Sequence, residues 1–332
     1  MSLTAASSAR TERVRRAPLP QGAGLLLLTA ASWVVYACIG EGFLSSFNLF
    51  ALSQLAAETA VIGAAQLVVI AIGHLNLAVG AVGVLVVMAT GWMTSVAGLP
   101  AGLAVLLGLF LGAACGALIG AIERLTGLGS FIVTLAMASV LYGLVLILSG
   151  GAAVSILPPS LTDFGAAQLL VPGLSWLVLP AVILFALLWL LYRRTALGWR
   201  MLSVGANPRT AELGGVPTGR IVLASFALSG LLSAVAAILE MTRVASALPS
   251  LGTDWLLLAF IVPILGGSPL RGGSVALGGA LVAALFIVSI NSGLVSLGVN
   301  AYWQQSAQAI VLLLAVFADR VARRRDGTSH AG

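Results

Sequence analysis

The sequence contains no lysine, and all sixteen of its basic side chains are arginine. A phosphate-binding loop of the Walker A type needs a lysine that reaches the phosphates of the nucleotide. The chain therefore has no standard nucleotide-binding loop of its own.

Histidine and cysteine are also scarce, with two of each. Cys38 and Cys115 fall in apolar runs without a second cysteine or a histidine at metal-ligand spacing, so we expect both to be free, buried side chains. No serine, histidine and aspartate at matching depths form a catalytic set, and no pair of carboxylates is placed for acid–base work. We therefore predict no catalytic residue, no metal site and no cofactor bound by this chain, and a protein that is not an enzyme.

Charged residues make up only 8% of the chain, whereas 60% of it is hydrophobic. Soluble domains are about 45–50% apolar, so this composition indicates a polytopic membrane protein. Apolar runs of about 20 residues can cross a bilayer, and such runs recur from residue 24 to residue 318. We expect an all-α fold of about ten transmembrane helices, placed at about 24–40, 48–72, 76–97, 101–122, 129–149, 173–192, 219–242, 254–269, 273–292 and 300–318.

The arginines predict the orientation of the chain in the membrane. If both termini are cytoplasmic, fifteen of the sixteen arginines fall on the cytoplasmic side and only Arg243 falls outside. Orientation in the membrane then explains the net charge of +6, which in a soluble protein would suggest nucleic acid. We expect disordered cytoplasmic tails at 1–22 and 321–332 on either side of a transmembrane domain at 23–320.

The longest polar interruption, residues 192–220, carries five of the arginines and is expected to face the cytoplasm, with a loop at 193–219. Asn207 is suited to cap a helix, Pro208 suits the first helical position, and the glycines at 214 and 215 end it. A short capped helix between two spans can dock on a soluble partner. The residues predicted to couple the chain to that partner are Asn207, Pro208, Arg209, Thr210, Ala211, Glu212, Leu213 and Gly214.

Two proline- or glycine-containing segments are expected at the opposite face. Residues 150–172 contain Pro158 and Pro159 and are predicted to form a structured cap or a short re-entrant turn, and residues 245–254 are their counterpart in the second half. Residues 266–273 are predicted to form a tight turn at the cytoplasmic face, or a partner contact.

Polar side chains inside the apolar runs are candidates for a translocation pathway. In residues 73–80, glycines enclose His74 and Asn76, which suggests unwound backbone that lines a cavity; the alternative is a tight turn in which Asn76 caps the next helix. Gln54, Glu58 and Gln66 lie near one face of the second span and either line a passage or bond a neighbouring helix. Glu58 should be paired or protonated.

Glu240 and Arg243, three residues apart at the outer end of a span, are expected to form a local ion pair.

Several stretches together resemble the ribose-type permease subunits of bacterial ABC importers, in the branched-chain amino acid and ribose permease superfamily. This group includes permeases for ribose, for other monosaccharides and for the autoinducer-2 signal. The likeness covers nearly the whole chain, and the order and spacing of its pieces are specific. The stretches are residues 43–80, 130–151, GANPRTAELGGVPTGR at 205–220, 228–238, LGGSPLRGGSVALGGAL at 265–281 and 291–320.

The resemblance implies a type II-like ABC importer permease fold in the bacterial cytoplasmic (inner) membrane. Two permease subunits, identical or different, would surround a passage for a sugar or sugar-like solute. Each would dock through 208–214 on an ABC ATPase subunit with duplicated nucleotide-binding domains, which binds the ATP and Mg²⁺. An extracytoplasmic binding protein would deliver the solute.

The sequence departs from the family pattern at two places. Asn76 stands where the family usually has an aspartate, and Leu256 and Leu258 stand where it commonly has glutamate and aspartate. These changes suggest a solute other than ribose or a heterodimeric partner that retains the acidic groups. The alternatives are a branched-chain amino acid or nucleoside permease of the same superfamily, and an ion-coupled secondary carrier, which would transport without an ATPase.

Overall fold

The structure is a computed structural model that describes residues 23–40 and 42–300 and six further positions, 303, 306, 308–310 and 313. Within these residues the chain is helical, and extended pairing is limited to two isolated bridges. The helices are α1 (Ala23–Ile39), α2 (Ser46–Ile70), α3 (Val79–Ser95), α4 (Ala101–Thr126), α5 (Ser130–Ser149), α6 (Pro159–Ala166), α7 (Val178–Arg194), α8 (Ala196–Ala206), α9 (Pro208–Leu213), α10 (Thr218–Val244), α11 (Trp255–Leu265) and α12 (Leu277–Ser296).

Five helices are long and apolar enough to cross a membrane: α2, α4, α5, α10 and α12. The number becomes six if α7 and α8, which meet at a bend of 74°, count as one span. Three shorter apolar helices, α1, α3 and α11, match three further expected spans. The tenth expected span, 300–318, and the tails at 1–22 and 321–332 lie largely or wholly outside the described residues.

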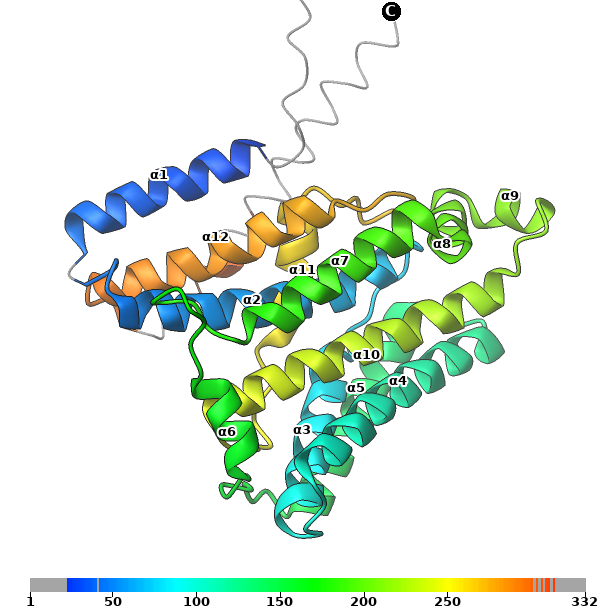
Figure 1. The fold of residues 1–332 in the computed structure, drawn as a ribbon. Helices are drawn as coiled ribbons and strands as arrows, with labels where there is room; N and C mark the ends of the chain where they lie inside the picture. The colour runs from blue at the N-terminus through cyan, green and yellow to red at the C-terminus, as the bar shows by residue number, and fades with distance from the viewer. Residues whose placement is uncertain are drawn as a thin grey trace, which may run out of the picture.

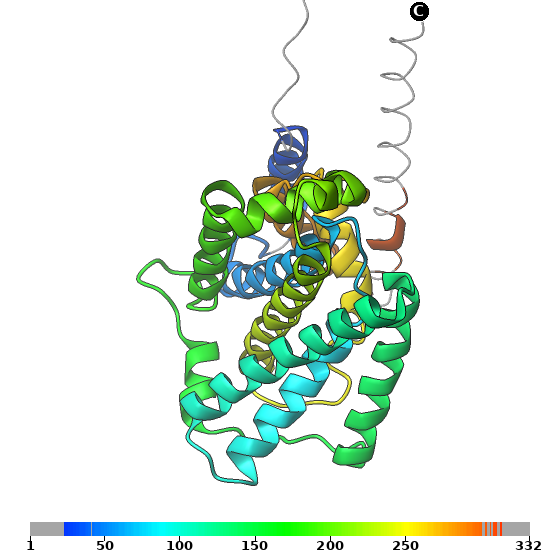
Figure 2. The ribbon, with the colours of Figure 1, turned by 90° about the vertical axis from the view of Figure 1, so that its right-hand side faces the viewer.

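Helices α2 and α10 form the centre of the bundle (Figures 1 and 2). In the membrane-spanning window of α2, 89% of the residues are buried, whereas α4 and α5 lie at the periphery with 33% and 28% buried. Helix α10 packs on α4, α2 and α3, and α2 also contacts α11, α12 and α7. The polar side chains of α2 are therefore surrounded by protein rather than by lipid.

Small residues bring α4 and α10 together. Gly112 and Gly116 on α4 face Gly230 and the backbone of Phe226 on α10 so closely that a Cβ atom on any of the three glycines would collide with main chain. Close backbone approach of this kind is how helices pack in lipid, where dispersion rather than the hydrophobic effect drives association. These glycines therefore serve helix packing.

The two ends of the bundle differ in structure. Helices α8 and α9 lie at one end, here called the α9 end, and α6 lies at the other, the α6 end (Figure 1). At the α6 end, Val154 and Ala247 exchange two backbone hydrogen bonds of 2.9 Å, so the segments 150–172 and 245–254 meet there. The first of them contains α6 and is structured, as expected.

Residues 245–254 are only partly at the surface, since Ala247, Leu251 and Gly252 are buried. They run along α3 from Ala247, which packs on Gly91, to Gly252, whose carbonyl oxygen contacts Gly80 at the start of α3. The hydroxyl group of Tyr142 donates a 3.1 Å hydrogen bond to the same carbonyl oxygen. Helices α3 and α11 are short because each is preceded by an unwound segment, and the segment before α11 reaches the first turn of α3, where Gly252 contacts Gly80.

Candidate functional site

Helix α9 confirms the short capped helix expected in the polar loop. The Oδ1 atom of Asn207 accepts a 3.0 Å hydrogen bond from the backbone N–H of Thr210, and Pro208 occupies the first turn. Gly215, with φ of 80°, ends the helix in a left-handed conformation that glycine adopts without strain. Ala211 is buried, whereas Arg209, Glu212 and Leu213 are exposed, and Leu213 reaches 86% exposure. Leu213 follows Glu212 and lies one turn after Arg209, so α9 presents one apolar and two charged side chains to the outside.

The polar region at 193–219 contains, besides the expected short helix, a second helix, α8, that was not expected. Thr195 begins α8 by accepting a 3.1 Å hydrogen bond from the N–H of Gly198 through its hydroxyl oxygen. Gly198 packs directly on the backbone of Leu191 and Tyr192, which permits the 74° bend from α7. Two joined helices therefore form this region, and α9 is positioned by α8 rather than by a flexible connection.

Residues 71–78, between α2 and α3, are unwound, as the sequence predicted. Hydrogen bonds join this segment to neighbouring parts of the fold. Gly73, with φ of 78°, makes the turn, and the N–H of Gly273 donates a 3.0 Å hydrogen bond to the carbonyl oxygen of Ala71. The N–H of Leu75 donates to the hydroxyl oxygen of Ser130 on α5 at 3.0 Å. The segment therefore begins at the α9 end and is joined to the turn before α12 and to α5.

The side chains of Asn76 and Gln66 accept hydrogen bonds from buried backbone N–H groups of this segment. The N–H of Asn76 donates to Oε1 of Gln66 at 3.3 Å, and the N–H of Ala78 donates to Oδ1 of Asn76 at 2.9 Å. The Nδ2 group of Asn76 donates to the hydroxyl oxygen of Ser229 on α10 at 2.9 Å. Asn76 thus holds the backbone just before α3 without capping that helix, whose N-cap is Ala78, and it also joins the unwound segment to α10.

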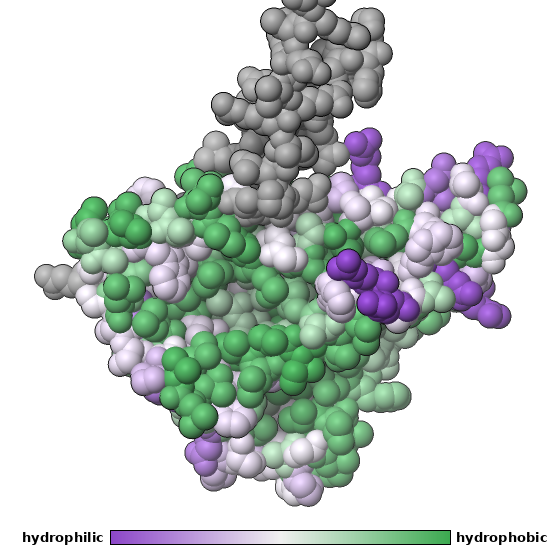
Figure 3. Space-filling model, turned by 45° about the horizontal axis from the view of Figure 1, so that its top comes forward, coloured by the Kyte–Doolittle hydropathy of each residue, from purple (hydrophilic) through white to green (hydrophobic). Residues whose placement is uncertain are grey.

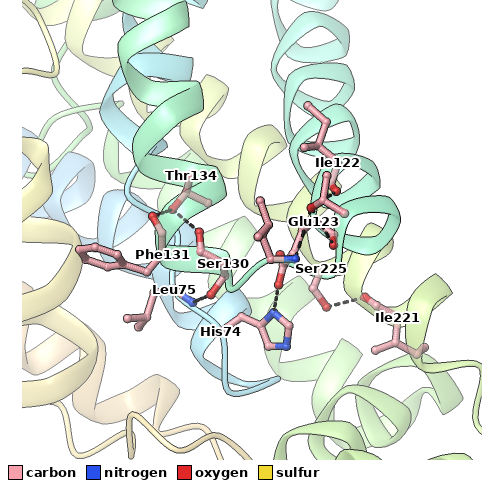
Figure 4. A network of polar contacts seen from close by, with 11 residues as sticks. His74, Leu75, Ile122, Glu123, Ser130, Phe131, Thr134, Ile221 and Ser225 are labelled. Carbon is pink, nitrogen blue, oxygen red and sulfur yellow. Dashed lines mark hydrogen bonds and ion pairs between the residues drawn. The ribbon is translucent and has the colours of Figure 1, made fainter.

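His74 contacts Glu123, near the end of α4, with 2.5 Å between Nδ1 and Oε1 (Figure 4). Glu123 is 6% exposed and His74 is 27% exposed, so the contact lies just inside the surface. The second carboxylate oxygen of Glu123 has no hydrogen-bond partner among the described residues. Both side chains line an open cavity of about 520 Å³ that also touches Arg124, Pro208 and Gly219. The unwound segment, the end of α4 and the start of α9 therefore meet around one space.

Glu58 is paired with Arg243, which also forms the expected local ion pair with Glu240. The Nε group of Arg243 donates a 2.8 Å hydrogen bond to Oε2 of Glu58, and the contact between its Nη2 atom and Glu240 is longer, at 3.8 Å. The expected pair joins residues three apart on the same helix. The fold also brings α2 beside α10, which places Glu58 next to the same guanidinium group.

Gln54 joins α2 to the α6 end. Its Nε2 group donates to the carbonyl oxygen of Gly165 at 2.6 Å and to the hydroxyl oxygen of Ser175 at 3.3 Å. Gln54, Glu58, Gln66 and Asn76 are all buried within the subunit, and each bonds another element. Of the five candidates for the pathway, His74 is the one that lines the open cavity described above.

The two cysteines agree only in part with expectation. Cys38 and Cys115 are both free, but Cys38 is exposed on α1 and only Cys115 is buried. In the part of the chain that the structure describes, no group of three histidine, cysteine or acidic side chains could hold a metal ion.

Three residues of this site were not identified from the sequence: Glu123, Ser130 and Ser229. Glu123 offered one signal, a carboxylate inside the last turns of an apolar helix, where burial of an unpaired charge is costly. Its partner, His74, is 49 positions away, and neither serine differs locally from other helical serines. Their grouping comes from helix packing rather than from any local pattern.

Comparison with known proteins gives a consistent picture. Residues 48–316 match the family model described as "Branched-chain amino acid transport system / permease component". The chain is 33% identical over 299 residues to the ribose import permease protein RbsC of Bacillus subtilis (strain 168), which covers 90% of this chain and 91% of the relative. It is 32% identical to RbsC of Escherichia coli (strain K12), with 89% and 91% covered. It is also 32% identical to the galactofuranose transporter permease protein YtfT of that strain, with 89% and 87% covered. No solved structure matches the chain.

Proposed function

Since the chain belongs to the family of branched-chain amino acid transport system permease components, we propose that it forms the translocation pathway of an ATP-driven importer for a sugar or sugar-like solute. Like its relatives, the chain is a permease component, and it is not an enzyme. The observation that carries the proposal for a sugar is the likeness to the ribose and galactofuranose permeases, which covers about nine-tenths of the chain.

The motive force comes from a separate ATPase subunit, with duplicated nucleotide-binding domains, that binds ATP and Mg²⁺. The absence of lysine supports this division of labour. Residues 207–214 are the contact with that subunit, because α9 projects exposed Arg209, Glu212 and Leu213 while Ala211 anchors it. Helix α9 is short and contacts both α8 and α10, so a displacement of α9 by the ATPase subunit can be transmitted to these two helices.

A chain of contacts leads from α9 into the bundle. Helix α10 begins five residues after α9 ends, and Gly219 in its first turn packs against the guanidinium group of Arg124. Glu123, the residue before Arg124 on α4, contacts His74 of the unwound segment. Movement of α9 thereby reaches residues 71–78 through α10 and α4.

The passage runs beside the unwound segments, between this subunit and a second permease subunit, identical or different. His74 faces the open cavity at the α9 end, and Asn76 and Gln66 set the shape of the segment that carries it. Gln54 and Glu58 act nearer the α6 end by fixing α6 and α10 against α2.

The α9 end faces the cytoplasm, and the subunit lies in the bacterial cytoplasmic membrane as a multi-pass protein with about ten spans. The arginines Arg124, Arg193, Arg194, Arg200, Arg209, Arg220 and Arg271 support this orientation. The extracytoplasmic binding protein then delivers the solute at the α6 end.

A branched-chain amino acid is the second candidate solute, because the family description names that class. An uptake assay distinguishes a sugar from a branched-chain amino acid as the solute. The chain is co-expressed with its ATPase subunit and binding protein, and uptake of labelled ribose, galactose and leucine is measured. ATP-dependent uptake of a sugar, abolished when the chain is omitted, is the expected result. Uptake of leucine without uptake of either sugar would overturn the sugar assignment while leaving the importer.

A further inference from the structure

A second cavity, of about 500 Å³, lies at the α9 end between the end of α7, α8 and the start of α12. Trp189, Tyr192 and Arg193 from α7 line one wall, and Leu202 of α8 contributes to the space between. Residues 273–279, which lead into α12, line the other wall. The contacts that join α9 to His74 do not pass through this cavity, so it has no part in the proposed coupling.

The cavity carries an uncompensated positive charge. The guanidinium group of Arg193 lies 5.4 Å from the ring centre of Trp189, a cation–π contact that leaves its N–H groups free to donate. None of the residues lining the cavity is acidic. Within the described part of the chain, Arg193 forms no ion pair. An anion is therefore the complementary ligand.

The opposite wall supplies backbone donors. The first residue of α12 is preceded by Ala276, which provides no side-chain cap, and the N–H groups of Leu277 and Gly278 have no acceptor among the described residues. Gly278 is exposed, and a Cβ atom built on it would meet nothing within 4 Å, so the backbone is open to the cavity. Ser274 adds an exposed hydroxyl group on the same wall. Free N–H groups and the helix dipole favour a phosphate group here.

The surroundings identify the source of that phosphate as lipid. Helix α7 exposes Val182, Ile183 and Leu187 toward the outside of the bundle, and each is more than half exposed. Trp189 and Trp199 follow at the α9 end, where tryptophan marks the level of lipid headgroups in membrane proteins. Figure 3 shows hydrophilic residues at the α9 end next to a broad hydrophobic surface.

We propose that this cavity binds the phosphate of an anionic phospholipid from the leaflet at the α9 end, between Arg193 and the first N–H groups of α12. The acyl chains lie along the exposed apolar face of α7. The bound lipid joins the corner between α7 and α8 to α12, and thereby stabilises the element from which α9 extends.

The test measures the melting temperature of the purified full chain in a neutral detergent with short-chain phosphatidylglycerol. Short-chain phosphatidylcholine and inorganic phosphate at the same concentrations are the comparisons. Arg193→Gln removes the charge from the cavity, and Arg194→Gln is the matched control, because Arg194 is the next residue of the same helix but does not line the cavity. Gly278→Asp places a carboxylate where the phosphate would lie, in a first turn of a helix that an acidic residue stabilises.

Phosphatidylglycerol is expected to raise the melting temperature of the wild-type chain and of Arg194→Gln, whereas phosphatidylcholine and phosphate are not. In Arg193→Gln, the concentration of phosphatidylglycerol needed for the same rise in melting temperature should be about fivefold higher. This factor corresponds to the loss of one arginine near an anionic surface. Gly278→Asp should fold at least as well as wild type and lose the response. An equal loss in Arg194→Gln, an unchanged response in Gly278→Asp, or an equal effect of inorganic phosphate would overturn the proposal.

Discussion

His74 and Glu123 join two parts of the molecule that are far apart in sequence, with Nδ1 of His74 2.5 Å from Oε1 of Glu123. The histidine belongs to the unwound segment after α2, and the glutamate belongs to the last turns of α4, next to Arg124 and the start of α10 (Figure 4). A displacement at the end of α4 therefore shifts the unwound segment through this contact.

Replacing His74 by alanine should be more damaging than replacing Glu123. His74→Ala leaves the buried carboxylate of Glu123 without its contact, and a buried polar group left unsatisfied costs about 1–3 kcal/mol, or more if it is charged. The double variant His74→Ala/Glu123→Ala should be more stable than His74→Ala alone, because the unpaired carboxylate is then gone. Thermal unfolding in detergent measures this, with Thr126→Ala as the control. A double variant whose loss of stability equals the sum of the two single losses would show that the residues act independently.

Removal of Arg243 should destabilise the chain more than removal of Glu240. Arg243→Gln leaves Glu58 and Glu240 buried without a cation, at a cost of about 1.5–3 kcal/mol in the free energy of unfolding. This range is below that of a fully buried pair because the arginine is 24% exposed. Glu240→Gln should cost less, since its contact with Arg243 is 3.8 Å long. Chemical unfolding of the three variants Arg243→Gln, Glu58→Gln and Glu240→Gln decides, and the account fails if Glu240→Gln is the most damaging.

Breaking α9 should separate ATP hydrolysis from transport. Ala211→Pro removes the 3.0 Å hydrogen bond from the N–H of Ala211 to the carbonyl oxygen of Asn207, and proline inside a helix costs about 3 kcal/mol. Arg209→Ala and Glu212→Ala should have smaller effects in the same direction, because they alter only the exposed face. The measurement is ATPase activity of the assembled importer with and without loaded binding protein, together with the affinity for that protein, which should not change. Ser203→Ala on α8 is the control, and normal coupling in the three α9 variants would remove the helix from the mechanism.

Gly116→Leu should prevent α4 from packing on α10. The added side chain would meet the backbone of Phe226 and Gly230, which cannot move aside as a flexible side chain can. Overpacking costs typically about 1–3 kcal/mol, and backbone contact places this variant at the upper end. Gly143→Leu on α5 is the matched control, since a Cβ atom there meets nothing within 4 Å. Fluorescence-detected size exclusion of both variants gives the comparison, and a monodisperse, equally stable Gly116→Leu would contradict the packing described.

The sequence predicted what depends on local pattern. The cap of Asn207, the proline at the first position of α9 and the glycines after it define that six-residue helix within residues 207–215. Hydrophobic runs located nine of the helical segments, although those that begin in unwound backbone, such as α3 and α11, proved shorter than the runs.

The sequence failed where a partner comes from a distant helix. The sequence did not indicate that Arg243 also pairs with Glu58 on α2, at a shorter distance than with Glu240, and Glu123 was not identified because its partner lies on another segment. Helix α8 was missed because Tyr192 to Ala206 mixes arginines with apolar residues, and only the close approach of Gly198 to Leu191 shows that the chain turns there. Periodicity contains no information on such contacts.

The measurement that tests the central claim most directly is solute uptake into proteoliposomes that contain the purified chain. We predict uptake only when the ATPase subunit, ATP with Mg²⁺ and the loaded binding protein are all present, and none when the chain alone is placed under a proton or sodium gradient. Uptake by the chain alone, driven by either gradient, would contradict the account and identify an ion-coupled carrier instead.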